Sequence, residues 1–357
     1  MRRVLQLIDS LEAGGAERVA VNYANGLISH VDGSYLCVTR AEGLLKASVN
    51  KAVGYLFLNK KATIDVSAIC RLYRFIKKEN ITVIHAHSSS YFLATLITIL
   101  NPKLKLVWHD HYGKSEFLEQ RPKRILQYCS KYFDHIFSVN SKLKDWASSQ
   151  LKTKTVSYLP NYAVVGDTVL STRLKGTEGK RIVCLANLRP QKDHINLLKA
   201  FKLVAKKNRE WTLHLVGKDF EDDYSKQVFE YIKSEALEGY VFFYGSCADV
   251  SAILLACDIG VLSSQSEGLP LALLEYGLAN LAVVATNVGE CNQIIKNKNT
   301  GLLVSAEDSN ALGSAIMSSI EDLNLRRAHA KQLTQLINTD FSETRALQTI
   351  VNTYTLF

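Results

Sequence analysis

Short runs of consecutive apolar residues recur along the whole chain, separated by longer stretches with the spacing of amphipathic helices. Runs that do not alternate with polar residues are typical of strands buried on both faces, and such strands form parallel sheets covered by helices. In the first half the pattern predicts strands at 4–8, 35–38, 54–58, 83–87, 106–109, 135–139 and 156–159. In the second half it predicts strands at 181–185, 211–216, 241–244, 259–262, 281–286 and 301–304.

Helical stretches between these strands complete a repeated α/β pattern. The clearest lie at 16–28, 66–78, 91–100 and 224–237. Residues 160–180 are polar and rich in turn-forming residues, as expected of a linker. We therefore predict an α/β protein with two doubly wound domains in tandem. The predicted boundaries are 1–163 for the first domain, 164–340 for the second, and 341–357 for a final helix that could pack on either domain and that we assign to the first.

The composition excludes several classes of protein. The chain has 357 residues, of which 47% are apolar and 22% charged, so a disordered or fibrous protein is excluded. Its 7 cysteines are scattered and never spaced C-x-x-C, which indicates reduced thiols in a cytoplasmic protein rather than a disulfide scaffold or a zinc ribbon. The longest apolar run, 91–100, has about half the length that a membrane-spanning helix needs.

The net charge of +9 is unevenly distributed along the chain. Residues 1–165 carry 23 Lys and Arg against 12 Asp and Glu, whereas residues 166–357 carry 20 against 22. A basic half fits nucleic acid, an anionic membrane surface or a phosphorylated ligand. The alternative is a set of scattered, solvated lysines.

Two glutamates eight residues apart flank a predicted helix start. Glu267 follows the strand at 259–262, and Pro270 suits the first turn of a helix. The amide of Gly268 would then lie at the helix N-terminus, where a phosphate is favoured. Glu275 lies among apolar residues and needs a partner, which two ribose hydroxyls would supply. The alternative is two unrelated glutamates, one capping a helix and one in an ion pair.

Two loops that follow predicted strands carry further candidate ligand contacts. Arg189 and Lys192 follow the strand at 181–185 and precede a helix, where two cations oppose the helix dipole unless an anion such as a diphosphate lies between them. Gly14 and Gly15 follow the first strand and would let a ligand approach the backbone, although they do not form a dinucleotide motif. The alternatives are exposed loop cations and a plain flexible turn.

Two His-x-His pairs lie at the carboxyl ends of the predicted strands 83–87 and 106–109. The first pair lies within its strand, and the second pair begins at the last residue of its strand. They are His85 with His87, and His109 with His111. Because residues i and i+2 of a strand face the same way, each pair could converge on one ligand. A metal, a polar active site and a structural role are all possible interpretations. We favour the polar active site, because the neighbouring sequence offers no carboxylate or thiolate with suitable spacing, and because the acidic run at 221–223 precedes a helix that it suits as a cap.

In this order, the segments resemble the retaining glycosyltransferases of family 4, which have the GT-B fold. The resemblance covers nearly the whole chain, and its most specific part is the glutamate pair. Asn187 stands where the family usually has a phosphate-binding arginine, and Arg189 could replace it. The segments that carry the resemblance are Gly14–Arg18, His85–Ser88, His109-Asp110, Pro160-Asn161, Pro190–Lys192, Val216-Gly217, Tyr244-Gly245, Ser266–Leu271, Val283–Gly289 and Thr300–Val304.

The resemblance implies two Rossmann-like domains that face each other across a cleft, with the nucleotide in the second and the acceptor in the first. It implies transfer of a sugar, with retention of configuration, from a UDP-sugar to a glycan or lipid-linked acceptor in cell-surface polysaccharide synthesis. No cofactor, metal or nucleic acid is expected. The alternatives are a GT-B relative that is not a transferase, such as a sugar-nucleotide epimerase or a non-catalytic subunit, and a metal-dependent hydrolase using the histidine pairs.

The resemblance also assigns roles on the donor side. Arg189 and Lys192 would neutralise the leaving diphosphate, Glu275 would bind the ribose, and Glu267 would hold the donor sugar. His109 would position the sugar or stabilise its oxocarbenium character. The further donor-binding candidates are Gly14, Gly15, Asn187, Gly217, Gly245, Gly268, Leu269 and Leu271.

The acceptor side is assigned to the basic half of the chain. Its candidates are His85, His87, His111, Arg121, Lys123 and Arg124, with Lys114 and Lys131 close by in the sequence. Phe117, Leu118, Ile125 and Leu126 lie among these cations, so the segment could face an anionic membrane that carries a lipid-linked acceptor. The expected location is cytoplasmic, peripheral on the inner face of the membrane. The alternative is a solvated helix face.

Overall fold

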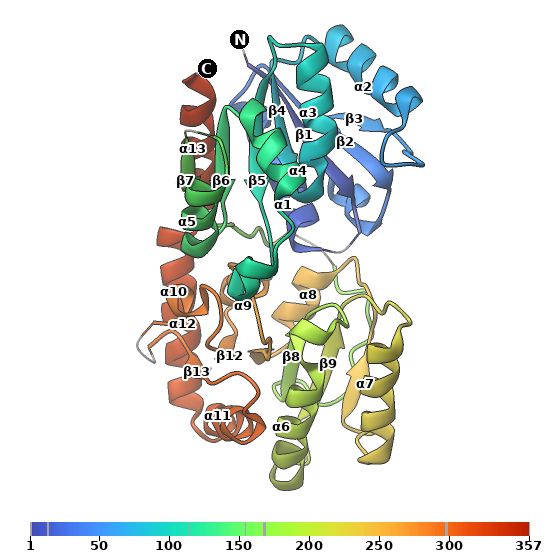
Figure 1. The fold of residues 1–357 in the computed structure, drawn as a ribbon. Coiled ribbons are helices and arrows are strands. Elements are labelled where there is room, and N and C mark those ends of the chain that lie inside the picture. The colour runs from blue at the N-terminus through green and yellow to red at the C-terminus, as the bar shows by residue number, and fades with distance from the viewer. Residues whose placement is uncertain are drawn as a thin grey trace. The chain divides into compact units, whose positions relative to one another are not determined.

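A computed structural model describes residues 2–12, 14–113, 115–153, 155–166, 169–296 and 299–356, with the backbone alone for Glu116. The chain forms two compact units (Figure 1). The first unit comprises Met1–Tyr162 and Glu343–Phe357, and the second unit comprises Ala163–Ser342. Each unit is built on a parallel sheet with helices on its faces, so each is described by itself.

The first unit contains a parallel sheet in the order β3-β2-β1-β4-β5-β6-β7. The strands are β1 (Arg3–Ser10), β2 (Gly33–Ala41), β3 (Gly54–Phe57), β4 (Val83–His87), β5 (Lys105–Asp110), β6 (His135–Ser138) and β7 (Val156–Tyr158). The order changes direction at β1, which pairs with both β2 and β4. In such sheets ligands bind beyond the carboxyl ends of the strands.

The first unit also contains helices, of which all but the last lie between its strands in the sequence. They are α1 (Gly15–Gly26), α2 (Val66–Lys78), α3 (Tyr91–Leu100), α4 (Arg124–Cys129), α5 (Ser141–Gln150) and α13 (Glu343–Thr355). Short 3₁₀ turns are η1 (Leu27–Ser29), η2 (Leu44–Ser48), η3 (Ser88–Ser90), η4 (Ser115–Gln120) and η5 (Ser130–Tyr132). Local sequence explains two of the starts: Asp65 accepts from the Ala68 amide at 2.9 Å, and Asn140 accepts from the Leu143 amide at 2.8 Å.

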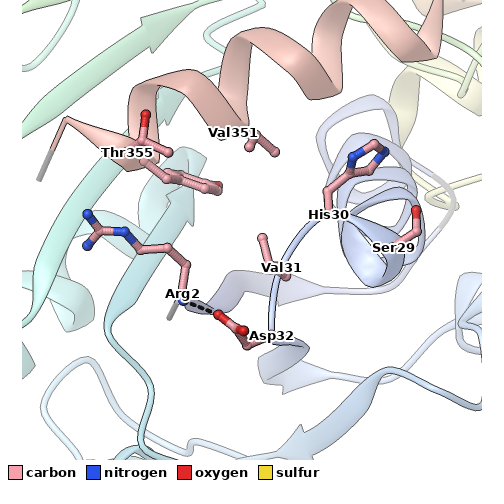
Figure 2. Close-up of a pocket in the computed structure, with 8 residues that line it drawn as sticks. Arg2, Ser29, His30, Val31, Asp32, Val351 and Thr355 are labelled. Carbon is pink, nitrogen blue, oxygen red and sulfur yellow. Dashed lines mark hydrogen bonds between the residues drawn. The ribbon is translucent and has the colours of Figure 1, made fainter.

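The C-terminal helix α13 belongs to the first unit although it follows the second in sequence. The Tyr354 hydroxyl lies 2.6 Å from Nδ1 of His85 on β4. Val351 and Thr355 line a pocket of about 540 Å³ together with residues around the start of β1, and Figure 2 shows the Arg2 amide donating to Asp32 at its edge. This pocket lies at the amino end of β1, away from the carboxyl ends where ligands are expected.

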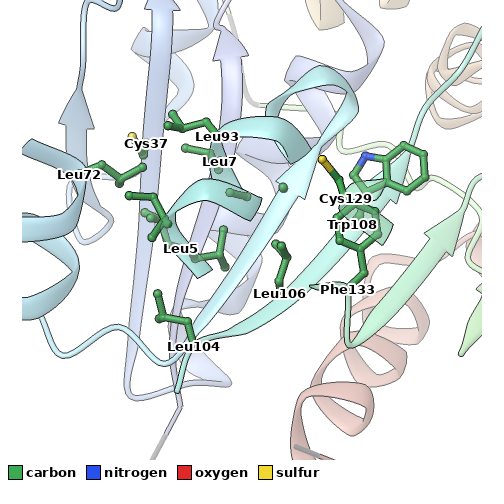
Figure 3. Close-up of a cluster of buried hydrophobic side chains, with 14 of the residues drawn as sticks. Leu5, Leu7, Cys37, Leu72, Leu93, Leu104, Leu106, Trp108, Cys129 and Phe133 are labelled. Carbon is green, nitrogen blue, oxygen red and sulfur yellow. The ribbon is translucent and has the colours of Figure 1, made fainter. Parts of the chain in front are cut away.

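The two faces of the central strands carry different chemistry. On one face Leu5, Leu106 and Trp108 belong to a buried apolar cluster (Figure 3). Because side chains alternate along a strand, the neighbouring positions of β4 and β5 point to the other face. There His87 and His109 are paired in register, and both are fully buried. The alternation that builds the core therefore gathers the histidines on the opposite face.

The second unit contains a parallel sheet in the order β10-β9-β8-β11-β12-β13. The strands are β8 (Arg181–Leu185), β9 (Thr212–Val216), β10 (Val241–Phe243), β11 (Ile259–Leu262), β12 (Ala282–Thr286) and β13 (Leu302–Val304). The helices are α6 (His194–Lys207), α7 (Asp223–Ser234), α8 (Val250–Leu255), α9 (Leu271–Leu278), α10 (Cys291–Ile294), α11 (Ser309–Glu321) and α12 (Leu323–Asp340), with a 3₁₀ turn η6 (Pro190–Lys192) before α6.

Side-chain caps define several helix starts in the second unit. Asp222 accepts from the Ser225 amide at 3.0 Å, which confirms the capping role predicted for the acidic run before α7. Asp193, in the left-handed conformation with φ of 49°, accepts from the Asn196 amide at 3.2 Å and starts α6. Across the described residues, no helix has the combination of length and apolar character needed to cross a bilayer.

Candidate active site

Two loops of the second unit meet at the carboxyl ends of β8 and β11. The Ser263 hydroxyl donates to the Lys192 carbonyl at 2.8 Å, and the Gln265 amide donates to the Gln191 carbonyl at 2.8 Å. The Gln265 side chain also donates to Asp193 at 3.0 Å. These bonds hold the turn after β8 against the loop after β11, so predicted site residues 75 positions apart are brought together.

The centre of this surface is an ion pair between Lys192 and Glu267. Nζ of Lys192 donates to Oε1 of Glu267 at 2.6 Å, and the Ser264 hydroxyl donates to the same oxygen at 2.6 Å. Glu267 is only 6% exposed, whereas the lysine is partly open to solvent. The sequence pointed to each residue separately, but did not predict that they pair.

Cations beside this pair gather around an aromatic ring. The Arg189 guanidinium lies 4.3 Å from the ring centre of Phe220, and the Lys218 ammonium lies 5.5 Å from it. The Asn187 side chain accepts from the Lys218 amide at 2.8 Å, which links the turn after β8 to the end of β9. Lys218 and Phe220 were not predicted as site residues. Both come shortly after the predicted strand 211–216, at the carboxyl end where ligand contacts are expected.

The expectation that Arg189 and Lys192 oppose the dipole of α6 without a compensating negative charge is wrong. Lys192 ends the turn η6, and α6 begins two residues later at His194 with Asp193 as its cap. The Asp193 carboxylate already supplies the negative charge that the helix N-terminus favours. The helix therefore does not need a bound anion between the two cations. What supports an anion site here is the positive charge that these side chains place on the surface.

Glycines let the strand ends pack closely. A Cβ at Gly217 would lie 2.2 Å from the Ala186 carbonyl oxygen, so the ends of β8 and β9 can approach only because this residue has no side chain. Gly289 has φ of +54°, and a Cβ there would lie 2.3 Å from the Glu267 carbonyl oxygen. Gly217 also donates its amide to the Gly245 carbonyl at 2.9 Å. The predicted donor-binding residue Gly217 thus has a packing role, whereas a Cβ at Gly245 would meet no atom within 4 Å, and that glycine is distinguished only by its φ of +65°.

Glu275 lies on α9, which begins at Leu271, so that Pro270 is the cap residue rather than part of the first turn as predicted. Its side chain is buried, and the flanking Leu269 and Leu271 are buried as well. The next residue fixes the helix, because the Tyr276 hydroxyl accepts from the Leu185 amide at 2.7 Å and donates to the Val261 carbonyl at 3.2 Å. The helix that carries Glu275 is therefore anchored to β8 and β11.

Candidates from the N-terminal half lie in the first unit. Gly14 caps α1 and Gly15 is its first residue. The predicted histidines form one stack, in which the ring centres of His109 and His111 are 4.2 Å apart and those of His85 and His87 are 4.8 Å apart.

Burial lowers the pKa of every histidine in this stack. The pKa values of His85, His87 and His109 lie well below the usual range, and that of His111 falls to about 3. All four rings are therefore uncharged at neutral pH. His109 is fully buried, and neither of its ring nitrogens has a hydrogen-bond partner among the described residues.

The prediction that Arg121 is an available acceptor-side cation is wrong. Its guanidinium donates two hydrogen bonds to Asp110, at 2.7 and 2.8 Å, and the side chain is almost fully buried. It also lies 4.4 Å from the ring centre of Tyr112 and 4.3 Å from that of Trp146. Arg121 is thus a structural ion-pair residue, and it leaves the set of cations that could meet a membrane.

The neighbouring cations remain on the surface. Lys123 and Arg124 are exposed, with the Lys123 ammonium donating to Gln150 at 2.7 Å. We name the basic-apolar face by the exposed residues of α4 and its two ends, which are Lys123, Arg124, Ile125, Tyr128 and Lys131, while Phe117 is exposed in η4. Leu126 points into the apolar core instead, and Lys114 lies outside the described residues.

Comparison with known families identifies the chain. Residues 171–335 match the model "Glycosyl transferases group 1", and residues 13–162 match the model "Glycosyltransferase Family 4". The chain belongs to glycosyltransferase family 4. This assignment replaces the hydrolase interpretation of the histidine pairs. The two Rossmann-like units are those of the GT-B fold, which confirms the predicted fold class.

Individual relatives agree with the family assignment. An uncharacterized glycosyltransferase of Haemophilus influenzae is 26% identical over 303 residues, covering 82% of each chain. The UDP-Gal:alpha-D-GlcNAc-diphosphoundecaprenol alpha-1,3-galactosyltransferase of Escherichia coli is 23% identical over 278 residues, covering 72% of this chain and 71% of the relative. The structure of Anabaena HepE in complex with UDP-glucose superposes with a TM-score of 0.82 at 18% identity, covering 100% of both chains.

Proposed function

We propose that this member of family 4 is a retaining hexosyltransferase that moves a sugar from a UDP-sugar to a lipid-linked or glycan acceptor in cell-surface polysaccharide synthesis. The observation that carries the proposal is the Lys192–Glu267 pair at the carboxyl ends of β8 and β11. A relative that uses UDP-Gal and acts on a diphosphoundecaprenol-linked sugar supports this choice of donor and acceptor, as does a neighbour of the same fold that binds UDP-glucose.

The pair suits a site that receives a negatively charged donor. When a diphosphate arrives, Lys192 exchanges its contact with Glu267 for the phosphate oxygens, and Arg189 adds a second positive charge. Positive charge fixed beside the leaving diphosphate stabilises the transition state, because negative charge builds up there as the bond to the sugar breaks. The released Glu267 carboxylate accepts hydrogen bonds from sugar hydroxyls, and Glu275 accepts them from the ribose.

Retention follows if the acceptor attacks from the face that the diphosphate leaves. The bond between the anomeric carbon and the diphosphate oxygen breaks, the bond to the acceptor oxygen forms on the same face, and a diphosphate oxygen takes the acceptor proton. No protein base is needed for this step. His109 is assigned a positioning role in this step.

A panel of UDP-sugars with undecaprenyl-diphosphate-linked acceptors tests the proposal. We expect one UDP-sugar to yield a glycosylated lipid that an α-specific glycosidase cleaves, with UDP released in equal amount. A β-linked product would contradict retention. Conversion of a UDP-sugar without any acceptor would indicate an epimerase, and UDP binding without turnover in the whole panel would indicate a non-catalytic subunit.

Transfer should not depend on Mg²⁺ or Mn²⁺. The cations that would neutralise the diphosphate are side chains, Lys192 and Arg189, and the acidic run before α7 is engaged in capping through Asp222. We expect the rate of metal-depleted enzyme to stay within about twofold when either ion is added, measured as UDP release. Loss of transfer on chelation that Mg²⁺ or Mn²⁺ restores would contradict this prediction and point to Asp222 and Asp223 as ligands.

The basic-apolar face should bind an anionic membrane. Each Lys or Arg near such a surface contributes on the order of 1 kcal/mol, and the attraction decays within a Debye length. Replacing Lys123, Arg124 and Lys131 by Gln should therefore reduce co-sedimentation with phosphatidylglycerol vesicles by at least about tenfold in low salt. Binding of the unmodified chain should weaken with added salt and be absent with neutral vesicles.

A matched variant separates this face from the general basicity of the first unit. Replacing Arg74, Lys77 and Lys78 by Gln removes the same charge from α2, where all three side chains are exposed. We expect this variant to sediment like the unmodified chain. An equal loss of vesicle binding in both variants would show that binding depends only on net charge. Equal binding to neutral and anionic vesicles would contradict the membrane proposal.

A further inference from the structure

We propose that His87, His109 and His111 form a binding site for one Zn²⁺ ion or a similar late first-row divalent ion. Each histidine offers a ring nitrogen, and the three nitrogens lie within 4.8 Å of one another. The sheet holds two of the three in place, since His87 at the end of β4 is in register with His109 on β5. This proposal concerns the first unit alone and does not rest on the proposed function.

His109 shows that this group lacks a partner. Its side chain has no exposed surface, yet both ring nitrogens are without a hydrogen bond among the described residues. A buried polar atom that has lost its water and gained no partner destabilises the folded protein, so such atoms are rare and need an explanation. A metal ion would bind the lone pair of His109 and supply the missing interaction.

The hydrogen bonds of His87 orient it as a ligand. Its Nε2 lies 2.8 Å from the Gln6 side-chain oxygen, which only accepts, so Nε2 carries the hydrogen and Nδ1 presents its lone pair. That Nδ1 lies 3.0 Å from Nε2 of His111. Metal-binding histidines commonly donate their second ring N–H to a carbonyl or carboxylate oxygen in this way, and Gln6 provides that oxygen.

Binding needs a modest rearrangement of the stack. In a tetrahedral zinc site with bonds of about 2.0–2.1 Å, ligand nitrogens lie about 3.3 Å apart. The 3.0 Å separation of His87 and His111 is close to this spacing, and His109 would have to turn out of the stack so that its lone pair points at the ion. His111 would move its proton to the other ring nitrogen, so all three rings stay neutral.

The ligand set determines the class of ion. The group consists of three imidazoles with no carboxylate or thiolate among the described residues that form it. Imidazole nitrogen favours Zn²⁺, Ni²⁺ and Cu²⁺, whereas Mg²⁺ and Ca²⁺ require oxygen ligands. Three protein ligands leave a fourth position for water, and the partial exposure of His111 provides a route for the ion.

Titration of the metal-free full chain with Zn²⁺, followed by calorimetry, tests the proposal. We expect one ion per chain, no binding of Mg²⁺ at the same concentrations, and intense visible absorption when Co²⁺ is bound instead. His111→Gln and His109→Gln should each weaken Zn²⁺ binding by more than about 100-fold, because a ligand is lost. Gln6→Ala should weaken it by about 10- to 100-fold, because it removes only the orienting oxygen.

Two control variants locate the ion. His135→Gln changes a buried histidine on the neighbouring strand that lies 2.7 Å from the Ser157 hydroxyl, and Cys70→Ser removes an exposed thiol. Both should bind Zn²⁺ like the unmodified chain. If His109→Gln fails to fold, as judged by circular dichroism, the variants His111→Gln, at a partly exposed residue, and Gln6→Ala still test the proposal. Less than about half an ion per chain, or an affinity unchanged by His111→Gln, would overturn the proposal.

Discussion

Replacing Arg121 by Met should lower the free energy of unfolding of the first unit by about 3–5 kcal/mol, the range for breaking a buried ion pair by removing one partner. The Asp110 carboxylate, which is 1% exposed, would lose two charge-assisted hydrogen bonds and remain buried. The packing of the guanidinium against Tyr112 and Trp146 would also be lost. Urea unfolding provides the measurement, with tryptophan fluorescence as the signal.

The tryptophans allow the first unit to be followed separately. Trp108 and Trp146 belong to the first unit and Trp211 to the second, so a Trp211→Phe background reports the first unit alone. This matters because a chain of two units need not unfold in a single step. Measuring every variant in the same background keeps the comparison between like transitions.

A double variant distinguishes a buried pair from simple loss of packing. Asp110→Asn combined with Arg121→Met leaves no uncompensated charge, so it should be less destabilising than Arg121→Met alone. Arg124→Met, on the exposed face nearby, should change the free energy of unfolding by less than about 0.5 kcal/mol. A loss below about 1 kcal/mol for Arg121→Met would place the pair in the class of surface salt bridges and contradict its structural role.

The strands and several helices were predictable because strands buried on both faces of a sheet consist of continuous apolar runs. β4 at Val83–His87 and β8 at Arg181–Leu185 coincide with the predicted ranges, as do α2 and α3. The strand β4 lies between the polar residues Thr82 and Ser88, and β8 follows Lys180, which limits the error at these ends. The capping aspartate before α7 was predictable for a similar reason, since a cap needs only residues three positions apart.

The pairing of site residues could not be predicted in the same way. Local motifs pointed to Lys192 and Glu267 separately, but the hydrogen bond between them joins loops after β8 and β11 and depends on the strand order. The error over Arg121 has the same origin. It lies in a basic stretch that favours a surface role, whereas its partner Asp110 is 11 residues earlier at the end of a buried strand.

The histidine stack could be predicted only in part. Alternation along a strand predicts that His85 and His87 share a face, and the same holds for His109 and His111. That the two pairs adjoin depends on the neighbouring positions of β4 and β5. The orientation of His87 depends on Gln6, which is 81 residues away on β1 and carries no local signal of such a role.

Replacing Lys192 by Ala should weaken UDP binding by about 1.5–3 kcal/mol, the range for a hydrogen bond to a charged group. This corresponds to an affinity roughly 10- to 200-fold lower, which calorimetry of UDP with the full chain measures directly. The physical reason is the loss of the ammonium that lies partly open to solvent at the carboxyl end of β8 and is held there by Glu267. Rates of transfer should fall further than affinity, because charge on the leaving diphosphate is greatest in the transition state.

The partner of Lys192 complicates this experiment and also provides its control. Without the lysine, the Glu267 carboxylate would face the diphosphate and repel it, so part of the loss in Lys192→Ala could come from the glutamate. Glu267→Gln keeps the shape and leaves Lys192 available, so UDP should bind at least as tightly while sugar transfer falls. The double variant Lys192→Ala with Glu267→Gln removes the repulsion, and the loss of affinity that remains measures the lysine–phosphate contact. If Lys192→Ala folds normally and binds UDP as tightly as the unmodified chain, Lys192 does not contact the phosphate. The ion pair between Lys192 and Glu267 would then have only a structural role.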